Sequence, residues 1–108
     1  MPKNSHDGSW DRLQEVSNLL KFYANKQKHL LENYEDIANS NKYSWKKFFR
    51  LNKVYNALAD PYRMILENTF MKKNNLYWWV DYYSKTTYYR LRSKAVKSFL
   101  NMYKYEEV

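Results

Sequence analysis

The chain has very few of the residues that break helices or build tight turns. Its 108 residues include one glycine, Gly8, and two prolines, Pro2 and Pro61. Two-residue hairpins usually need Gly, Asn or Asp at positive φ angles, and glycine-rich phosphate loops need several glycines close together. The shortage therefore argues against a sheet protein and against a loop of that kind. It favours helices joined by short connections.

Cysteine is absent, and so are long apolar runs. A chain without cysteine forms no disulfide, thiolate metal site or cysteine nucleophile, which fits a reducing compartment. No apolar stretch approaches the roughly 20 residues that a membrane-spanning helix needs. Residues 1–9 are polar and lack the apolar core of a signal peptide. We therefore expect a cytoplasmic protein with no membrane partner, in which residues 1–9 form a disordered tail.

Side chains that commonly carry catalysis are sparse. The two histidines, His6 and His29, are far apart in sequence, and no His or Asp spacing matches a metal site. Glu32 and Asp36 lie one helical turn apart, but a carboxylate pair on an exposed helix is usually solvated charge rather than an acid–base pair. We expect a protein that is not an enzyme and that uses neither a cofactor nor a metal ion.

Positive charge is concentrated in the later part of the chain. The net charge is +8, and residues 42–108 hold 14 basic and 5 acidic side chains, whereas residues 1–41 hold 5 and 6. Such a balance favours an anionic partner, nucleic acid before an anionic membrane or an acidic protein. An A/T-rich genome, which enriches Lys, Asn and Tyr, is the alternative explanation for part of the lysine excess.

The first periodic segment predicts a long helix from about Trp10 to Ala38, with Ser9 as its N-cap. Its pattern fits either a helix packed against the rest of the chain or a dimeric coiled coil through the 13–37 seam. In the second case Gln27 would set the register of the two helices. The apolar positions recur at steps of three and four, and they are Leu13, Val16, Leu20, Tyr23, Leu30, Tyr34 and Ile37.

Two further helices are expected in the middle of the chain. Ser44 is the predicted cap of a helix over residues 45–59. Asp60 is the predicted cap of a helix over residues 61–71, with proline at its first position. Their inward-facing residues are expected to be Trp45, Phe48, Leu51, Tyr55, Leu58, Ile65, Leu66 and Phe70.

The last third predicts a turn at residues 72–75, a short aromatic helix at 76–81, and a final helix from Lys85 to about Tyr103 capped by Ser84. The short helix is expected to contribute core rather than a stacking platform for single-stranded nucleic acid, which is the alternative for its aromatic rings. Those rings belong to Trp78, Trp79, Tyr82 and Tyr83.

The expected fold class is therefore all-α, with four to five helices and a long N-terminal helix packed with a C-terminal helix-turn-helix. Residues 10–108 are predicted to form a single helical domain. Within it, residues 10–59 form a helical hairpin, and residues 61–104 form the helix-turn-helix unit, because helix, turn, short helix and long basic helix follow in that order.

In a helix-turn-helix unit the last helix lies in the DNA major groove. Apolar residues should hold it to the body, while cationic and hydroxyl groups point outward to bases and phosphates. The inward residues are expected to be Tyr88, Leu91, Ala95, Phe99 and Met102. The predicted contact residues are Ser84, Lys85, Thr86, Tyr89, Arg90, Arg92, Lys94 and Lys97. Further phosphate anchors are expected at Lys46, Lys47, Lys72 and Lys73.

The segment from Tyr83 to Val96 resembles the recognition helix of the ArpU/RinA-type phage transcriptional regulators of Gram-positive bacteria. Those carry a similar Ser-x-Ser/Thr-Thr-Tyr-Tyr-Arg-x-(Arg/Lys)-x-Lys-Ala-Leu pattern. The segment is similar, more loosely, to region 4 of bacterial sigma factors, and the resemblance covers about residues 62–99. The positions that it places at base and phosphate contacts are Lys85, Thr86, Tyr89 and Arg90.

The short helix departs from that family pattern. Trp78 and Tyr82 fall where the family has small residues, and Asp81 falls where an apolar residue is usual. These differences predict a helix pair that crosses at a different angle, or a remodelled turn.

These patterns predict sequence-specific binding of double-stranded DNA and a role in transcription regulation. Two alternatives remain open. One is a helical protein-interaction module that docks on RNA polymerase or on another regulator, which predicts little intrinsic affinity for DNA. The other is a DNA-packaging or architectural protein, which predicts affinity with little sequence preference and a steep dependence on salt.

Overall fold

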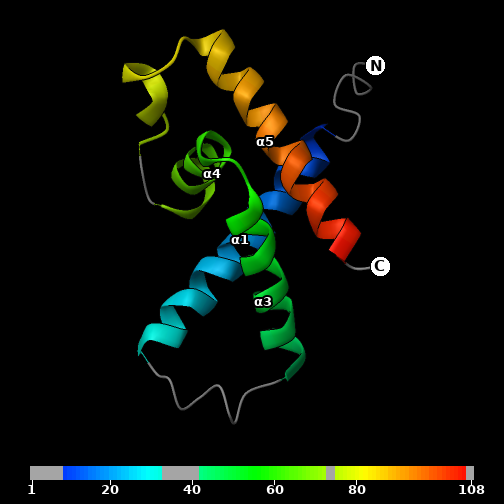
Figure 1. Cartoon of the computed structure of the whole chain (residues 1–108). Helices are drawn as coiled ribbons and strands as arrows, with labels where there is room; N and C mark the ends of the chain where they lie inside the picture. The colour runs from blue at the N-terminus through cyan, green and yellow to red at the C-terminus, as the bar shows by residue number, and fades with distance from the viewer. Residues whose placement is uncertain (1–8, 33–41, 73–74, 107–108) are drawn as a thin grey trace.

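The fold is all-α. A computed structural model of the chain describes residues 9–32, 42–72 and 75–106 (Figure 1). These residues contain no strand, which confirms the predicted fold class. Their helical elements are α1 (Ser9–Glu32), α3 (Lys42–Ala57), α4 (Asp60–Leu66), the π turn η2 (Glu67–Met71), the 3-10 turn η3 (Trp78–Asp81) and α5 (Lys85–Glu106).

The apolar seam of α1 packs inside the chain. Val16, Leu20 and Tyr23 are buried, and α1 contacts α3, α5 and η2. Gln27 is exposed at the edge of this contact. Because the buried positions of the seam are filled by the chain itself, they are not free to pair with a second helix. The predicted disordered tail before Ser9 and the predicted end of the helix, with Tyr34 and Ile37, lie outside the described residues.

The predicted N-caps of α1 and α3 are wrong. Ser9 is the first residue of α1 rather than its cap. α3 begins at Lys42, so Ser44 lies inside its first turn, and α3 ends at Ala57. The buried face of α3 is close to the prediction and adds Val54. Its members are Trp45, Phe48, Leu51, Val54 and, just after the helix, Leu58.

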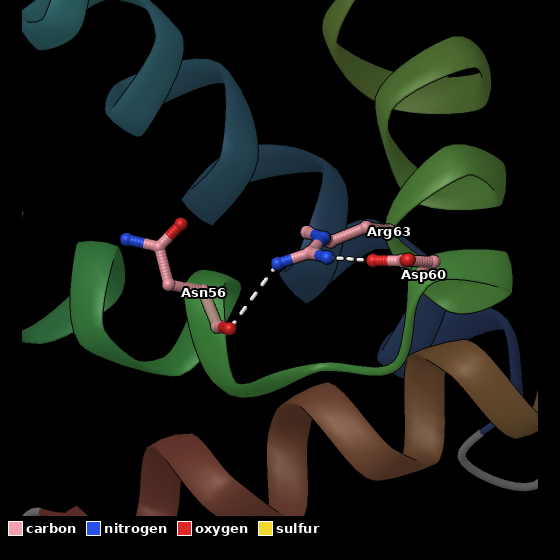
Figure 2. A network of polar contacts seen from close by, with 3 residues as sticks. All are labelled: Asn56, Asp60 and Arg63. Atoms are coloured by element: carbon pink, nitrogen blue, oxygen red, sulfur yellow. Dashed lines mark hydrogen bonds and ion pairs between the residues drawn. The ribbon is translucent and has the colours of Figure 1, made fainter.

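The junction between α3 and α4 shows why Asp60 is not a cap. The residue before α4 is Ala59, in an extended conformation, and it makes no side-chain cap bond. Asp60 instead forms an ion pair with Arg63, and Arg63 donates a second hydrogen bond to the carbonyl of Asn56 at 3.2 Å (Figure 2). That carbonyl belongs to the last turn of α3, where no helical partner is available. Arg63 thus satisfies a backbone carbonyl at the end of α3. The Asp60 carboxylate pairs with Arg63 and does not cap the first turn of α4.

α4 continues through the π turn η2 to Met71, where the sequence predicts the helix to end. The wider turn is closed by a hydrogen bond of 2.9 Å from the amide of Lys72 to the carbonyl of Glu67. Ile65 and Leu66 are fully buried, and Phe70 is half-buried beside them.

One hydrophobic core joins α1, α3, α4, α5 and η3. The prediction that Tyr88, Ala95 and Phe99 face inward is confirmed. α5 also buries Val96, Leu100 and Tyr103, which do not belong to the predicted inward-facing residues. Because both α1 and α3 contact α5, the helix is covered on more than one side. Figure 1 shows the C-terminal half of α5 beside these helices, and residues Arg12 and Leu13 at the start of α1 line a small pocket with Arg92 of α5.

Stability is expected to fall at alkaline pH through Tyr55. Burial raises the pKa of the Tyr55 hydroxyl from 10.0 to about 12, and Glu67 and Tyr23 add to the rise while Arg63 opposes it. The folded chain therefore keeps a proton that the unfolded chain loses near pH 10, so this contribution to stability is lost as pH rises through 12. Thermal unfolding followed by circular dichroism should show a falling melting temperature over this range.

The variant Tyr55→Phe should show a shallower decline, since it cannot ionise. Tyr105→Phe is the matched control, because the Tyr105 side chain is 80% exposed, and it should decline like the wild type. Identical slopes for Tyr55→Phe and the wild type would contradict the assignment.

Candidate nucleic-acid interface

The start of α5 is fixed by Ser84, as the sequence predicts. The Ser84 Oγ accepts a hydrogen bond from the Thr87 amide at 3.2 Å and donates one to the Thr87 hydroxyl at 2.9 Å. A serine in this position satisfies one of the amides that a helix leaves without a partner in its first turn. The cap therefore fixes the residue at which α5 begins.

Tyr88 attaches the first turns of α5 to the rest of the chain. Its ring stacks on Trp79 with centroids 4.7 Å apart and an interplanar angle of 5°. The Trp78 ring meets it edge-on at 5.8 Å. Its hydroxyl and that of Thr69 in η2 share a hydrogen bond of 2.8 Å. Tyr88 thus ties η2 and η3 to α5.

The segment before α5 is shorter than predicted. A 3-10 turn of four residues, η3, replaces the helix expected over residues 76–81. Trp79 is buried, and its Nε1 donates to the carbonyl of Leu76 at 3.1 Å, so the expectation of core holds for this ring. It is wrong for Tyr82, whose side chain is 68% exposed. Trp78 and Tyr83 are partly buried against the core.

Most of the predicted contact residues of α5 lie on its exposed side. No Asp or Glu occurs from Tyr82 to Tyr105, so no acidic residue of this segment offsets its positive charge. Within the part of the chain that the structure describes, the ion pair of α5 is a long one of 3.9 Å between Lys104 and Glu15 of α1. The exposed contact residues, termed here the basic face, are Lys85, Thr86, Tyr89, Arg90, Lys94 and Lys97.

Arg92 does not belong to the basic face, and the prediction that it points outward is wrong. The residue is half-buried, with its guanidinium carbon 4.7 Å from the ring centroid of Tyr89 and 5.8 Å from that of Tyr88. Two residues along a helix turn its side chain by about 200°, so Arg92 and Arg90 point to different sides. The rotation between neighbouring positions of a helix is thus enough to predict that Arg90 and Arg92 lie on different sides of α5.

The turn after η2 contributes less charge than the sequence suggests. Lys72 is exposed, but its Nζ lies 3.8 Å from a carboxylate oxygen of Glu67, which offsets part of its charge. Lys73 lies outside the described residues.

A second cationic cluster lies on α3, which contains no acidic residue. Arg50 donates from Nη2 to the Tyr103 hydroxyl at 2.8 Å and lies over the same ring at 4.6 Å. The Lys47 ammonium lies 4.6 Å from the ring centroid of Phe22 on α1. These groups surround a pocket of about 280 Å³, whose lining is Tyr43, Lys46, Lys47, Arg50 and Tyr103. The expected phosphate anchors Lys46 and Lys47 are thus brought together with Arg50.

Comparison with known proteins gives no match to a protein family, to a characterised protein or to a solved structure. Over the described ranges, no helix has both the length and the apolar character needed to cross a membrane. The same ranges hold no group of three or more His, Asp or Glu side chains arranged to bind a metal ion.

Loss of the Ser84 cap should destabilise the protein measurably. Replacing an N-cap serine by alanine typically costs about 0.5–2 kcal/mol, so Ser84→Ala should lower the free energy of unfolding by about 1 kcal/mol. Ser84→Asp should retain wild-type stability, because aspartate also accepts the amide bond and favours the positive end of the helix. Urea unfolding measures both.

Ser93→Ala serves as the control, since Ser93 is exposed in the interior of α5. It should change stability little, because alanine is the better helix former. A wild-type midpoint for Ser84→Ala would show that the cap contributes nothing.

Proposed function

We propose that the protein binds double-stranded DNA through the basic face of α5 and acts in transcription regulation by recognising a particular sequence. The observation that supports this most is the combination of exposure and charge on α5. Lys85, Arg90, Lys94 and Lys97 are exposed on it, and no carboxylate occurs between Tyr82 and Tyr105. Phosphate neutralisation by such cations supplies most of the affinity of proteins for DNA.

The geometry of α5 fits insertion of its N-terminal half into a groove. The major groove is about 12 Å wide and admits one α-helix. Arg90 and Lys85 are the side chains proposed to contact guanine edges, and Thr86 and Tyr89 supply hydroxyl groups beside them. Lys94 and Lys97 follow on later turns, where contact with phosphates is expected.

The cluster on α3 is proposed as a second contact with the DNA backbone. Tyr103, in its lining, follows Arg90 by 13 residues, which is about 20 Å along the axis of α5. Arg90 and Tyr103 also lie about 140° apart around α5, so the cluster would meet the DNA backbone outside the groove that Arg90 is proposed to enter. Lys46, Lys47 and Arg50 could therefore hold a phosphate several base pairs away from the groove contacts.

A dimer through the seam of α1 is not part of this proposal. Val16, Leu20 and Tyr23 are buried within one chain. A chain that acts alone would contact a single site rather than the paired half-sites that symmetric dimers require.

An alternative function is docking on a protein, such as RNA polymerase or another regulator. The observation that favours it is the apolar surface of the turn around η3, where Leu76 is 83% and Val80 is 55% exposed. Large apolar side chains exposed close together in the chain can mark a protein contact. Under this alternative the protein has little affinity for DNA of its own. A packaging role remains a third option, marked by affinity without sequence preference.

The direct test is a titration of labelled random-sequence duplex at two salt concentrations. The wild type should bind with strong salt dependence, because each neutralised phosphate contributes roughly 0.9 to the slope of log K against log salt. The variant Lys85→Ala with Arg90→Ala should weaken binding, because it removes two of the cations proposed to lie closest to the DNA, and the salt dependence should become less steep. Circular dichroism confirms that the variant is folded.

A charge-matched control is Lys21→Ala with Lys28→Ala, since both lysines are exposed on α1. It should bind duplex nearly as well as the wild type. Equal losses in the two double variants would argue against a contact by α5 and for a general effect of charge. No binding by the wild type at low salt would reject DNA binding and favour the docking alternative. Enrichment of one sequence from the random pool would support sequence-specific regulation, whereas binding without enrichment would support packaging.

A further inference from the structure

An aromatic pocket of about 220 Å³ lies beside the N-terminal half of α5, between η2, η3 and the helix. The Trp79 ring has two tyrosine rings near it, besides that of Tyr88. Tyr77 is 6.3 Å from it at an angle of 59°, and Tyr89 is 6.0 Å from it at 57°. The rings of Tyr77 and Tyr89 are therefore both tilted relative to the buried Trp79 ring. Tyr77 is 66% and Tyr89 41% exposed, so aromatic surface remains open to a ligand.

Arg92 gives this pocket its charge. The side chain is half-buried, lines the pocket, and lies over the Tyr89 ring at 4.7 Å. Among the side chains that the structure describes, no ion pair joins Arg92 to a carboxylate. A guanidinium that is partly withdrawn from water has lost hydration, and an anionic ligand would restore that loss through charge-assisted hydrogen bonds.

The combination of rings and charge selects the class of ligand. A cluster of aromatic rings alone can bind an ammonium cation, but Arg92 already occupies the cation position over Tyr89 and repels a second positive charge. A flat aromatic group with a negative charge fits both features. The pocket also offers a hydroxyl from Thr69 and an amide from Asn75, which are suited to the polar edge of a base.

We infer that this pocket binds one nucleotide, with its base against the exposed rings of Tyr77 and Tyr89 and its phosphate on Arg92. Base stacking on aromatic side chains tolerates different bases, since every base has a π face. The volume is below the roughly 300–1,000 Å³ of sites for larger ligands, which limits it to about one nucleotide. The nucleotide is either free in solution or an unpaired residue of a strand.

This site shares Tyr89 with the basic face, but its cation comes from another side of the helix. Arg92 and Arg90 lie about 200° apart around α5, so the guanidinium of the pocket is not one of those proposed to enter the major groove. Variants at Arg92 and Tyr77, which line the pocket and do not belong to the basic face, therefore separate nucleotide binding from duplex binding.

The experiment uses the full chain and three probes: adenosine 5′-monophosphate, adenosine, and a short single-stranded oligo-dA. Binding is followed by tryptophan fluorescence, because Trp79 lies in the pocket, and by calorimetry. At least one of the phosphate-bearing probes should bind, and adenosine should bind about tenfold more weakly than the monophosphate if the monophosphate binds. Arg92→Gln should remove that difference.

Tyr77→Ala should weaken binding of the phosphate-bearing probe by about tenfold through lost stacking. Lys94→Gln is the matched control for Arg92→Gln, since it removes one charge from the exposed side of the same helix. It should leave nucleotide binding unchanged and weaken duplex binding, whereas Arg92→Gln should do the reverse. Circular dichroism establishes that each variant is folded.

Binding of the monophosphate, weakened by both pocket variants, identifies a site for a free nucleotide. Binding of the oligonucleotide alone, with the same sensitivity to both variants, identifies a site for an unpaired residue of a strand. The inference is overturned if neither phosphate-bearing probe binds at millimolar concentration. It is equally overturned if Arg92→Gln and Tyr77→Ala bind the probes as the wild type does.

Discussion

Three parts of the chain meet at the side chain of Tyr88. Its ring lies flat against Trp79 of η3, and its hydroxyl bonds to Thr69 of η2. Both neighbours lack long regular structure, since η3 has four residues and η2 has five. η2 is also held by α4, which it continues, and by α1, whereas η3 depends on the packing of Trp79 against the buried Tyr88 ring. The exposure of the basic face and the shape of the aromatic pocket both depend on this contact.

Periodicity and capping made much of the fold predictable. Ser84 caps α5 as expected, and Tyr88, Ala95 and Phe99 face inward, because these properties follow from spacing within one helix. The predicted caps at Ser9, Ser44 and Asp60 are wrong, because each helix begins at or before the residue named. α3 extends further toward the N-terminus, and the Asp60 carboxylate is taken by Arg63. Burial of residues such as Leu100 could not be predicted, since it depends on how many neighbours α5 has.

The candidate site was predictable to a similar degree. The exposure of Lys85, Arg90, Lys94 and Lys97 follows from their distance in phase from the inward stripe of α5. The prediction for Arg92 is wrong, because a basic residue of an amphipathic helix can also lie at the edge of the buried side and pack on aromatic rings, as Arg92 does on Tyr89. The aromatic pocket was missed because its walls come from three elements, and aromatic residues in sequence do not show which faces stay open. Only the placement of η2 against α5 brings Thr69 near Trp79 and Tyr89.

The two halves of α5 are supported unequally, and this has a consequence for motion. Its C-terminal half buries Phe99, Leu100 and Tyr103, whereas Lys85, Thr86, Tyr89 and Arg90 lie in the open. Amide hydrogens of the first turns should therefore exchange with solvent through local opening, at a lower free energy than those around Phe99, which need the whole core to open. The end of the helix proposed to meet DNA can thus rearrange on its ligand while the rest of the domain stays folded.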